Sequence, residues 1–401
     1  MRLPGVLVPR ALVADTGAFG GAVAGEMLAG DLVVGNGRAV LAPAAAEPSR
    51  LVLPRFADPH VHLDKCHTAH RMPVIGGDLD AAIAAQRIDK GHWTEGDIRA
   101  RAARGLAELA QAGCGAVRSH VDWGTPQDDS AAPLAWEVLG DIDTGPLHLQ
   151  RAALVSMPVL ADRTPAERIA RQLARDGGVL GAFVNGQPEI GDGLANVFRA
   201  GADHDLMLDF HADEGLRAGL DGVERIADAA LALRYEAPIL IGHACALMNC
   251  KGDDLRRIAD KLARAGIAVA ALPYTNLYLQ GRGAGTPDRR GLAPLHELRA
   301  AGVRVVLGAD NVRDAFCPLG NHDPFATLAL AALSAHLDPP FEHWLATITT
   351  DARLAIGLPA LTIDTADPSD LLVFETDSLA GLLSDRPRAI PLTEITGAGG
   401  A

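Results

Sequence analysis

Two histidines that can bind one metal ion, His60 and His62, are separated by a single residue at the end of a short apolar run. Alternate side chains of an extended strand point to the same face, so both imidazoles can reach the same ion. Further groups of this kind follow other short apolar runs: His211 and Glu214 in HADE, His243 in GHA, and Asp310 in GAD. Donors that leave separate strands are what a mononuclear metal site on the rim of a barrel requires.

The elements that must position these donors recur along the chain. Eight short apolar runs lie between residues 51 and 361: LVLPRFADPHVH, GAVRSHVD, LHLQRAAL, VLGAFVN, LMLDFHAD, PILIGHA, IAVAALP and VRVVLGAD. Helical stretches such as DIRARAARGLAELAQAG and DDLRRIADKLARAG lie between them, and Gly113 and Gly266 stand where these two helices should end. The alternation predicts an α/β fold, a (β/α)8 TIM barrel. Every candidate ligand then falls at the C-terminal end of a strand, on the face that carries active sites.

The two ends of the chain have a different pattern. Residues 1–55 alternate short β-type runs with Gly, Pro and Asp, and β-like sequence returns after residue 361 in LTIDTADPSDLLVFET. We therefore expect a small discontinuous β-sandwich domain, built from residues 1–55 together with 362–401. It would stand beside a catalytic barrel over residues 56–361.

Composition excludes several classes of function. The 401 residues are 48% hydrophobic and 21% charged, as in soluble globular proteins, and the formal net charge of −14 argues against nucleic-acid binding. Pro4 and Pro9 interrupt the first apolar residues and no apolar stretch is long enough to cross a bilayer, so we expect neither an export signal nor a membrane span. Five irregularly spaced cysteines favour a reducing cytoplasm over a disulfide framework.

Several longer motifs occur in a fixed order over most of the expected barrel: PHVHLDK, RSHVD, HADE, GHACAL, NLYLQGR, RRG and GADNVRDAFCPLGN. With them the chain resembles the amidohydrolase superfamily, in particular its cytosine deaminase-like branch, which includes enzymes of the N-isopropylammelide hydrolase and creatinine deaminase type. The resemblance implies one divalent metal ion per chain, Zn²⁺ or Fe²⁺, and a homo-oligomer. By position, it implies metal ligands at His60, His62, His211 and Asp310, a proton shuttle at Glu214, and a residue that orients the attacking hydroxide at His243.

The chemistry of these residue types agrees with those roles. A divalent cation lowers the pKa of bound water to about 7. Asp310 can accept that proton, and Glu214, three residues after His211, can carry a proton to a ring nitrogen and then to a leaving amine. His243 can donate a hydrogen bond near the tetrahedral carbon. Glu214 could instead be a helix-start carboxylate favoured by the helix dipole. Binuclear members of the superfamily carry a bridging Lys after the fourth strand; here that run ends VLGAFVNGQ, so a second metal is not expected.

The residues that contact the substrate are harder to predict. The candidates after the strands are Lys65, His120, Ser156, Asn185, Gln187, Asn276, Gln280, Arg282, Asn311 and Phe316. Lys65 could equally be a surface cation, and the amide residues could be turn formers. Three positions depart from cytosine deaminases: Ser156 stands near a pyrimidine-reading Gln, Asn311 replaces the second of two acids, and Phe316 replaces a Trp. Because pockets that hydrogen-bond their substrate discriminate strongly, these changes predict a substrate other than cytosine.

The leading hypothesis is a metal-dependent hydrolytic deaminase of a cyclic amidine or other nitrogen heterocycle, with ammonia or an amine as the leaving group. The alternative is hydrolytic ring opening of a cyclic amide or ureide, which would release no ammonia. A third hypothesis is a catalytically silent barrel that binds a small ligand as a sensor. Glu214 argues against it, because an idle site needs no proton shuttle.

Overall fold

The larger part of the chain forms a barrel of parallel strands. The computed structural model describes residues 1–35, 37–72, 76–124, 128–129, 131–283 and 285–397. Eight strands lie side by side in their chain order, each parallel to the next. They are β6 (Phe56–Val61), β7 (Cys114–Asp122), β8 (His148–Ser156), β9 (Val179–Val184), β10 (Leu208–Ala212), β11 (Ile239–His243), β12 (Ala268–Ala271) and β13 (Arg304–Leu307).

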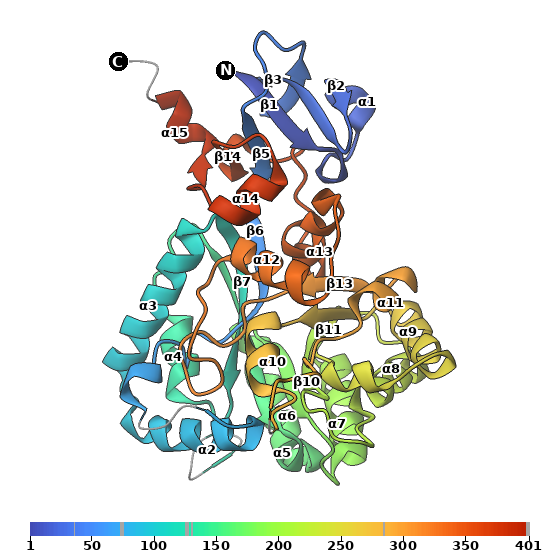
Figure 1. Ribbon diagram of the computed structural model, residues 1–401. Coiled ribbons are helices and arrows are strands. Elements are labelled where there is room, and N and C mark those ends of the chain that lie inside the picture. Colours follow the sequence, from blue (N-terminus) through green and yellow to red (C-terminus); the bar gives the residue numbers. More distant parts are fainter. Residues whose placement is uncertain (36, 73–75, 125–127, 130, 284, 398–401) are drawn as a thin grey trace.

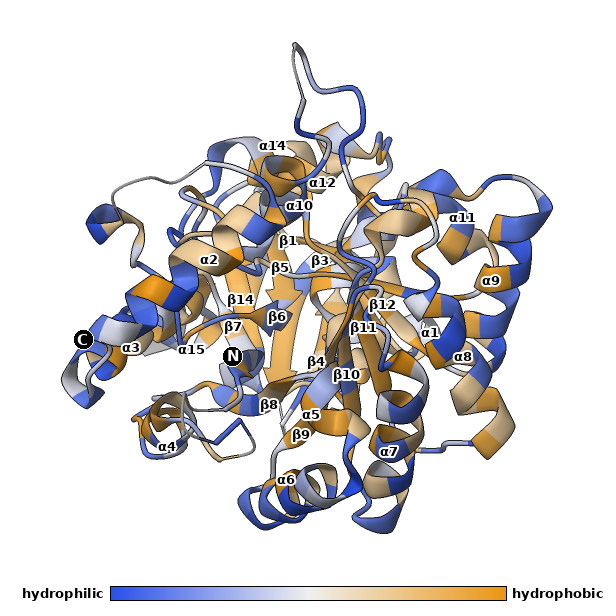
Figure 2. Cartoon of the chain, turned by 90° about the horizontal axis from the view of Figure 1, so that it is seen from below, coloured by the Kyte–Doolittle hydropathy of each residue, from blue (hydrophilic) through white to orange (hydrophobic). Residues whose placement is uncertain are grey.

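Helices connect successive strands and surround the barrel, with hydrophilic residues on their outer faces (Figure 2). They are α3 (Glu95–Gln111), α4 (Leu134–Gly140), α5 (Met157–Ala161), α6 (Arg163–Asp176), α7 (Ile190–Asp203), α8 (Gly222–Leu233), α9 (Asp253–Arg264), α11 (Leu295–Ala300), α12 (Pro324–Ser334) and α13 (Thr350–Ala355). Thr94 caps α3 by accepting a hydrogen bond from the Asp97 amide. Gly113 and Gly266, just after α3 and α9, have φ angles of 93° and 65°, which glycine adopts without strain.

The barrel closes where the chain leaves β13 beside β6. The Asp310 amide donates to the His60 carbonyl at 2.8 Å, and Val61 pairs with Asp310 in an isolated parallel bridge. Two short helices stand near the C-terminal ends of the strands: α2 (Leu79–Asp89), between β6 and α3, and α10 (Pro273–Leu279), after β12. The closing seam therefore brings the first and last predicted metal-binding segments together.

Both ends of the chain contribute to a second, separate sheet, which lies at the top of Figure 1. Its strands are β1 (Arg2–Pro9), β2 (Ala22–Ala24), β3 (Met27–Gly35), β4 (Arg38–Ala42), β5 (Arg50–Pro54), β14 (Leu371–Phe374) and β15 (Ile390–Pro391). Short helices accompany it: α1 (Thr16–Phe19), α14 (Leu379–Asp385) and α15 (Leu392–Gly397). The order is β15-β14-β5-β1-β3-β2, with β4 also paired to β3, and the sheet is mixed because β1 and β5 are parallel.

The predicted fold class, a (β/α)8 barrel with a small β unit from both termini, is confirmed. One detail differs, because the terminal strands hydrogen-bond into one connected sheet rather than two stacked ones. The first apolar run of the barrel pattern is also divided: LVLP belongs to β5 of the second sheet, and the barrel begins at Phe56. No helix within the described ranges has both the length and the apolar character that a membrane crossing needs. All five cysteines are free thiols.

Candidate metal centre and substrate cavity

Five side chains from four strand ends meet at the mouth of the barrel, and we call them the donor cluster: His60, His62, His211, His243 and Asp310. His60 lies in β6 and His62 just after it, so the pleat directs both side chains to one side of the strand. His211 lies in β10, His243 ends β11, and Asp310 follows β13. The cluster is fully enclosed, since none of the five is more than 3% exposed.

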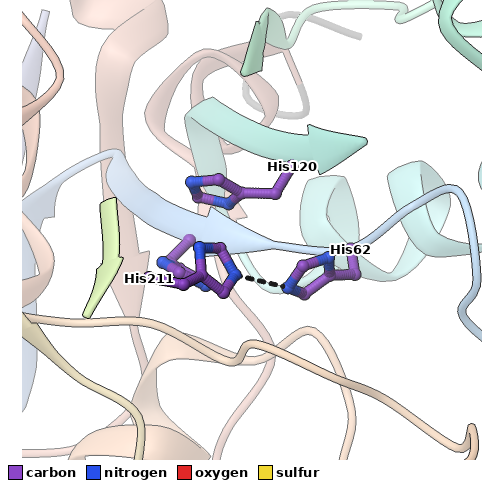
Figure 3. A group of neighbouring side chains, drawn as sticks. His62, His120 and His211 are labelled. Carbon is purple, nitrogen blue, oxygen red and sulfur yellow. Dashed lines mark hydrogen bonds between the residues drawn. The ribbon is translucent and has the colours of Figure 1, made fainter. Parts of the chain in front are cut away.

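The distances between donor atoms suit a tetrahedral ion. Asp310 Oδ1 lies 3.2 Å from His62 Nε2 and 3.5 Å from His60 Nε2, and His62 Nε2 lies 3.2 Å from His211 Nε2. Figure 3 shows His62 and His211 directed at each other. Ligands about 2.0–2.1 Å from a tetrahedral Zn²⁺ stand roughly 3.3 Å apart. These contacts therefore have the length of ligand–ligand edges around one metal ion.

The donor atoms also lack other partners. Both ring nitrogens of His60, Nδ1 of His62 and His211, and both carboxylate oxygens of Asp310 are buried without a hydrogen bond. Burial lowers the pKa of His62 and His211 well below the usual value, which leaves neutral imidazoles with free lone pairs. Burial raises the pKa of Asp310, but the neighbouring His60 and His62 outweigh it and keep the group ionised. A divalent cation would satisfy these atoms, so the residues fit the metal that the sequence predicts.

The backbone around the cluster is arranged to place His60. The Asp58 carboxylate accepts hydrogen bonds from the His60 amide at 3.1 Å and the Ala309 amide at 3.1 Å. Gly242 and Gly308 leave room for the His60 side chain, because a Cβ there would come within 2.6 Å and 2.9 Å of it. His243 and Asp310 have φ angles of 70° and 58°. This left-handed conformation is uncommon for residues other than glycine, although Asp and His adopt it more often than most.

His243 of the donor cluster and the neighbouring Glu214 have complementary proton states. Burial raises the pKa of Glu214 to about 8 and lowers that of His243 to about 3. Asn276 Nδ2 donates to His243 Nδ1 at 3.0 Å, so the ring proton resides on Nε2, 3.8 Å from Glu214 Oε2. The pair therefore offers a protonated carboxyl and an imidazole N–H at neutral pH.

A cavity of about 300 Å³ opens beside the donor cluster, and we call it the substrate cavity. Its wall is formed by His62, Lys65, Leu79, Ile83, Gln86, Arg87, Lys90, Asp122, Trp123, Leu154, Ser156, Phe183, His211, Glu214, His243, Asn311 and Phe316. Lys65 is held by Asp122, whose Oδ1 lies 2.6 Å from Nζ, and Lys90 contacts the other oxygen at 2.7 Å. The apolar and aromatic residues of this wall offer surface against which a planar heterocycle can pack, and the polar residues offer it hydrogen-bond partners.

The structure brings four of the predicted substrate residues into this wall: Lys65, Ser156, Asn311 and Phe316. It places six elsewhere: His120, Asn185, Gln187, Asn276, Gln280 and Arg282. Gln187 accepts from the Asn185 amide and donates to the Phe183 carbonyl, which makes both part of a turn. Asn276 acts on His243 instead, Gln280 is buried outside this wall, and Arg282 stacks over Tyr278 at 4.5 Å.

His120 packs against the donor histidines and does not line the substrate cavity (Figure 3). Its ring centroid is 3.9 Å from that of His60, and its Nε2 is 2.9 Å from Asp209 Oδ1. Arg118 contacts the other oxygen of Asp209 at 2.8 Å. Burial raises the pKa of Asp209, but His120 and Arg118 outweigh it, and the pKa falls to about 2. The ligand atoms of His120, His60, His62 and His211 all lie within 4.8 Å of one another, so His120 is a further potential metal ligand. The sequence does not suggest this role.

Sequence reasoning also misses the contribution of α2. Gln86 is 2% exposed, and neither polar atom of its side-chain amide has a hydrogen-bond partner among the described residues. It lines the substrate cavity together with Leu79 and Ile83 of the same helix. In the sequence, this part of the cavity wall could have been found from the spacing of the three residues at i, i+4 and i+7, because that spacing places them on one helix face.

The comparisons with known proteins agree with this site. The amidohydrolase family model matches residues 77–386. The pterin deaminase of Rhizobium rhizogenes is 31% identical over 92% of this chain and 87% of its own length. The crystal structure of 5-methylcytosine deaminase from Klebsiella pneumoniae with phosphonocytosine has a TM-score of 0.80 at 22% identity, covering 97% of this chain and 95% of that one. N-isopropylammelide isopropylaminohydrolase from Burkholderia multivorans gives 0.69 at 22% identity, covering 97% of each.

The chain belongs to the amidohydrolase family. With its buried histidine and aspartate donors, it is a metal-dependent amidohydrolase of the deaminase type, an enzyme that acts on carbon–nitrogen bonds other than peptide bonds.

Proposed function

We propose that this enzyme removes an amino group, by hydrolysis, from a planar oxo-heterocycle of the pterin class. One observation carries the proposal: a single cavity is bounded by His62, His211 and His243 of the donor cluster, by Glu214, and by the bare amide of Gln86. The first two suit hydrolysis at an amino-substituted ring carbon. The third offers one donor and one acceptor, which complement the N–H and C=O of a lactam edge.

The residues divide the reaction as follows. His60, His62, His211 and Asp310 would hold the metal, which when bound supplies Lewis acidity and an activated water. Glu214, with a pKa of about 8, holds a proton that it can give to a ring nitrogen. Once ionised, it can accept a proton from water and pass it to the departing amine. His243 Nε2–H stabilises negative charge that develops on the attacking oxygen.

The rest of the cavity would select and orient the ring. Phe183, Trp123 and Phe316 supply aromatic surface, and Lys65 Nζ lies 5.3 Å from the Phe316 ring centroid. Burial lowers the pKa of Lys65, but Asp122 and Asp64 outweigh it, so the ammonium stays charged. It can bind a carbonyl oxygen of the substrate. The related pterin deaminase supports a fused two-ring substrate over a single pyrimidine ring.

The test is a substrate panel with two readouts, ammonia release and ring absorbance. Enzyme reconstituted separately with Zn²⁺ and Fe²⁺ is given pterin, cytosine, an amino-s-triazine, and a fused aminoheterocycle without the lactam carbonyl. We expect ammonia from pterin with the highest kcat/KM, and a large loss for the analogue without the carbonyl. Loss of ring absorbance without ammonia would instead establish ring opening.

A further inference from the structure

A second group of potential metal ligands lies outside the substrate cavity, and we call it the distal cluster: His67, Glu108 and His322. His67 is in the loop after β6, Glu108 is in the last turn of α3, and His322 precedes α12. Their ligand atoms all lie within 4.8 Å of one another. Glu108 Oε2 is 2.9 Å from His322 Nδ1 and 3.4 Å from His67 Nε2. These distances bracket the roughly 3.3 Å edge of a tetrahedral zinc site.

Hydrogen bonds among the three residues do not satisfy their polar atoms. Within the part of the chain that the structure describes, both ring nitrogens of His67, which is 5% exposed, lack a hydrogen-bond partner, and so does Nε2 of the fully buried His322. The neighbouring Asn321 Oδ1 is also buried without one. A cation bound by one nitrogen of each ring and by Glu108 Oε2 would give the His67 ring a partner that it lacks.

The surroundings prepare Glu108 to be a ligand. Arg104 Nε donates to Oε1 at 3.2 Å and Arg313 Nη1 lies 4.0 Å from the same oxygen, which leaves Oε2 to the histidines. Burial raises the pKa of Glu108, but His322 and His67 outweigh it and keep a carboxylate. Burial lowers the pKa of His322, which favours a neutral ring. A cavity of about 290 Å³, lined by Glu108, Asn321 and His322, gives an ion a route to the cluster.

We propose that the distal cluster binds a second divalent metal of the Zn²⁺ class through two imidazoles and one carboxylate, with the fourth position filled by water or Asn321. This ion is structural and is separate from the reacting centre. It would connect two loops of the substrate cavity, because His67 lies two residues after Lys65 and His322 lies six residues after Phe316. The His67 amide already joins these loops by donating to the Val312 carbonyl at 3.0 Å. The proposal does not depend on the identity of the substrate.

The test is the metal content of variants reconstituted with excess Zn²⁺, desalted, and measured by elemental analysis. We expect two ions per chain in the wild type, one in His211→Ala, one in His322→Ala, and none in the double variant. His204→Ala removes an ordinary His–Glu pair, in which Nε2 lies 2.8 Å from Glu167, and should retain two ions. No metal in folded His211→Ala, or an undiminished count in His322→Ala, would overturn the proposal.

A second measurement, the melting temperature with excess Zn²⁺, keeps the proposal testable if His322→Ala folds poorly. In the His211→Ala background, excess Zn²⁺ should raise the melting temperature, because an ion that binds only the native state stabilises it. Adding Glu108→Gln, which keeps the shape but removes the charge, should abolish that rise. The visible spectrum of the Co²⁺-loaded His211→Ala protein should show tetrahedral d–d bands. A Zn²⁺ response that survives Glu108→Gln would mean that the ion binds elsewhere.

Discussion

The donor cluster and the opposite wall of the substrate cavity are built from different kinds of element. The donors lie at the ends of barrel strands that pair with neighbouring strands. Asp58, Gly242 and Gly308 fix the position of His60. The opposite wall comes from α2 and from residues 311–316, which side-chain contacts hold in place. Strand ends thus fix the reaction, whereas a helix and a loop adjust the choice of substrate. The comparison predicts that changes at the donors abolish chemistry, and that changes at the wall alter selectivity or local stability.

The largest effects should follow from changes beside and within the donor cluster. Glu214→Gln preserves shape but removes the transferable proton, so kcat should fall by about 10²–10⁴-fold while the metal remains bound. His211→Ala should abolish activity together with the metal of the reaction centre. Steady-state kinetics and metal analysis of the two variants, side by side, separate proton transfer from metal binding. An active Glu214→Gln enzyme would remove Glu214 from the mechanism.

Replacing Gln86 tests whether the cavity wall formed by α2 determines which substrate is preferred. Gln86→Leu fills the same volume but loses both polar groups, so kcat/KM for a lactam-bearing substrate should fall by about 10–100-fold, since one unmet hydrogen bond costs about 1–3 kcal/mol. The analogue without the carbonyl should be affected far less. Gln172→Leu, on the surface of α6, is the matched control and should change neither value. Equal losses for both substrates would mean that Gln86 only shapes the cavity.

The anchoring of α2 gives a smaller effect, on stability rather than chemistry. Arg71 binds both oxygens of Asp89, the last residue of α2, at 2.6 and 2.8 Å, and reaches Asp97 at 2.7 Å. Asp89 is only 5% exposed, so Arg71→Ala leaves a buried charge poorly paired and should lower the free energy of unfolding by about 2 kcal/mol. It should also raise KM because α2 loosens. Urea denaturation and kinetics check both effects.

Arg99→Ala is the control for that prediction, because its partners Glu95 and Asp141 are exposed. Such a pair contributes about 0.5 kcal/mol or less. If Arg71→Ala proved as mild as Arg99→Ala, α2 would be held by its apolar contacts alone.

The same contrast explains what could be predicted from the sequence. The donors are recognisable because HxH spacing and apolar runs report strand ends directly, and strand ends of a barrel converge. Gln86 is not recognisable, because a Gln in an Ala-rich helix resembles a surface residue until α2 packs over the barrel mouth. His120 follows an apolar run like the donors, yet the structure directs it to Asp209 inside the barrel. The distal cluster is not recognisable for another reason: His67 and His322 lie in loops and Glu108 lies in α3, so none of the three ends an apolar run.

Asp314 holds the loop of residues 311–316 in place, and its replacement should have the smallest effect on stability. Its carboxyl accepts hydrogen bonds from Asn311 Nδ2 at 2.7 Å and from the amides of Phe316 and Cys317. Burial raises its pKa from 3.8 to about 7. Between these pH values Asp314 is ionised in the unfolded chain and neutral in the native protein, so native stability falls as pH rises and this loss is complete above about pH 7.

Asp314→Asn removes this titration. The variant should therefore gain on the wild type by on the order of 1 kcal/mol as the pH rises from 6 to 7. Urea denaturation of both metal-saturated proteins across pH 5–8 measures the difference, and pH effects on metal binding, common to both curves, cancel. Parallel curves would show that Asp314 is ionised in the native loop, paired with Lys65 rather than isolated by burial.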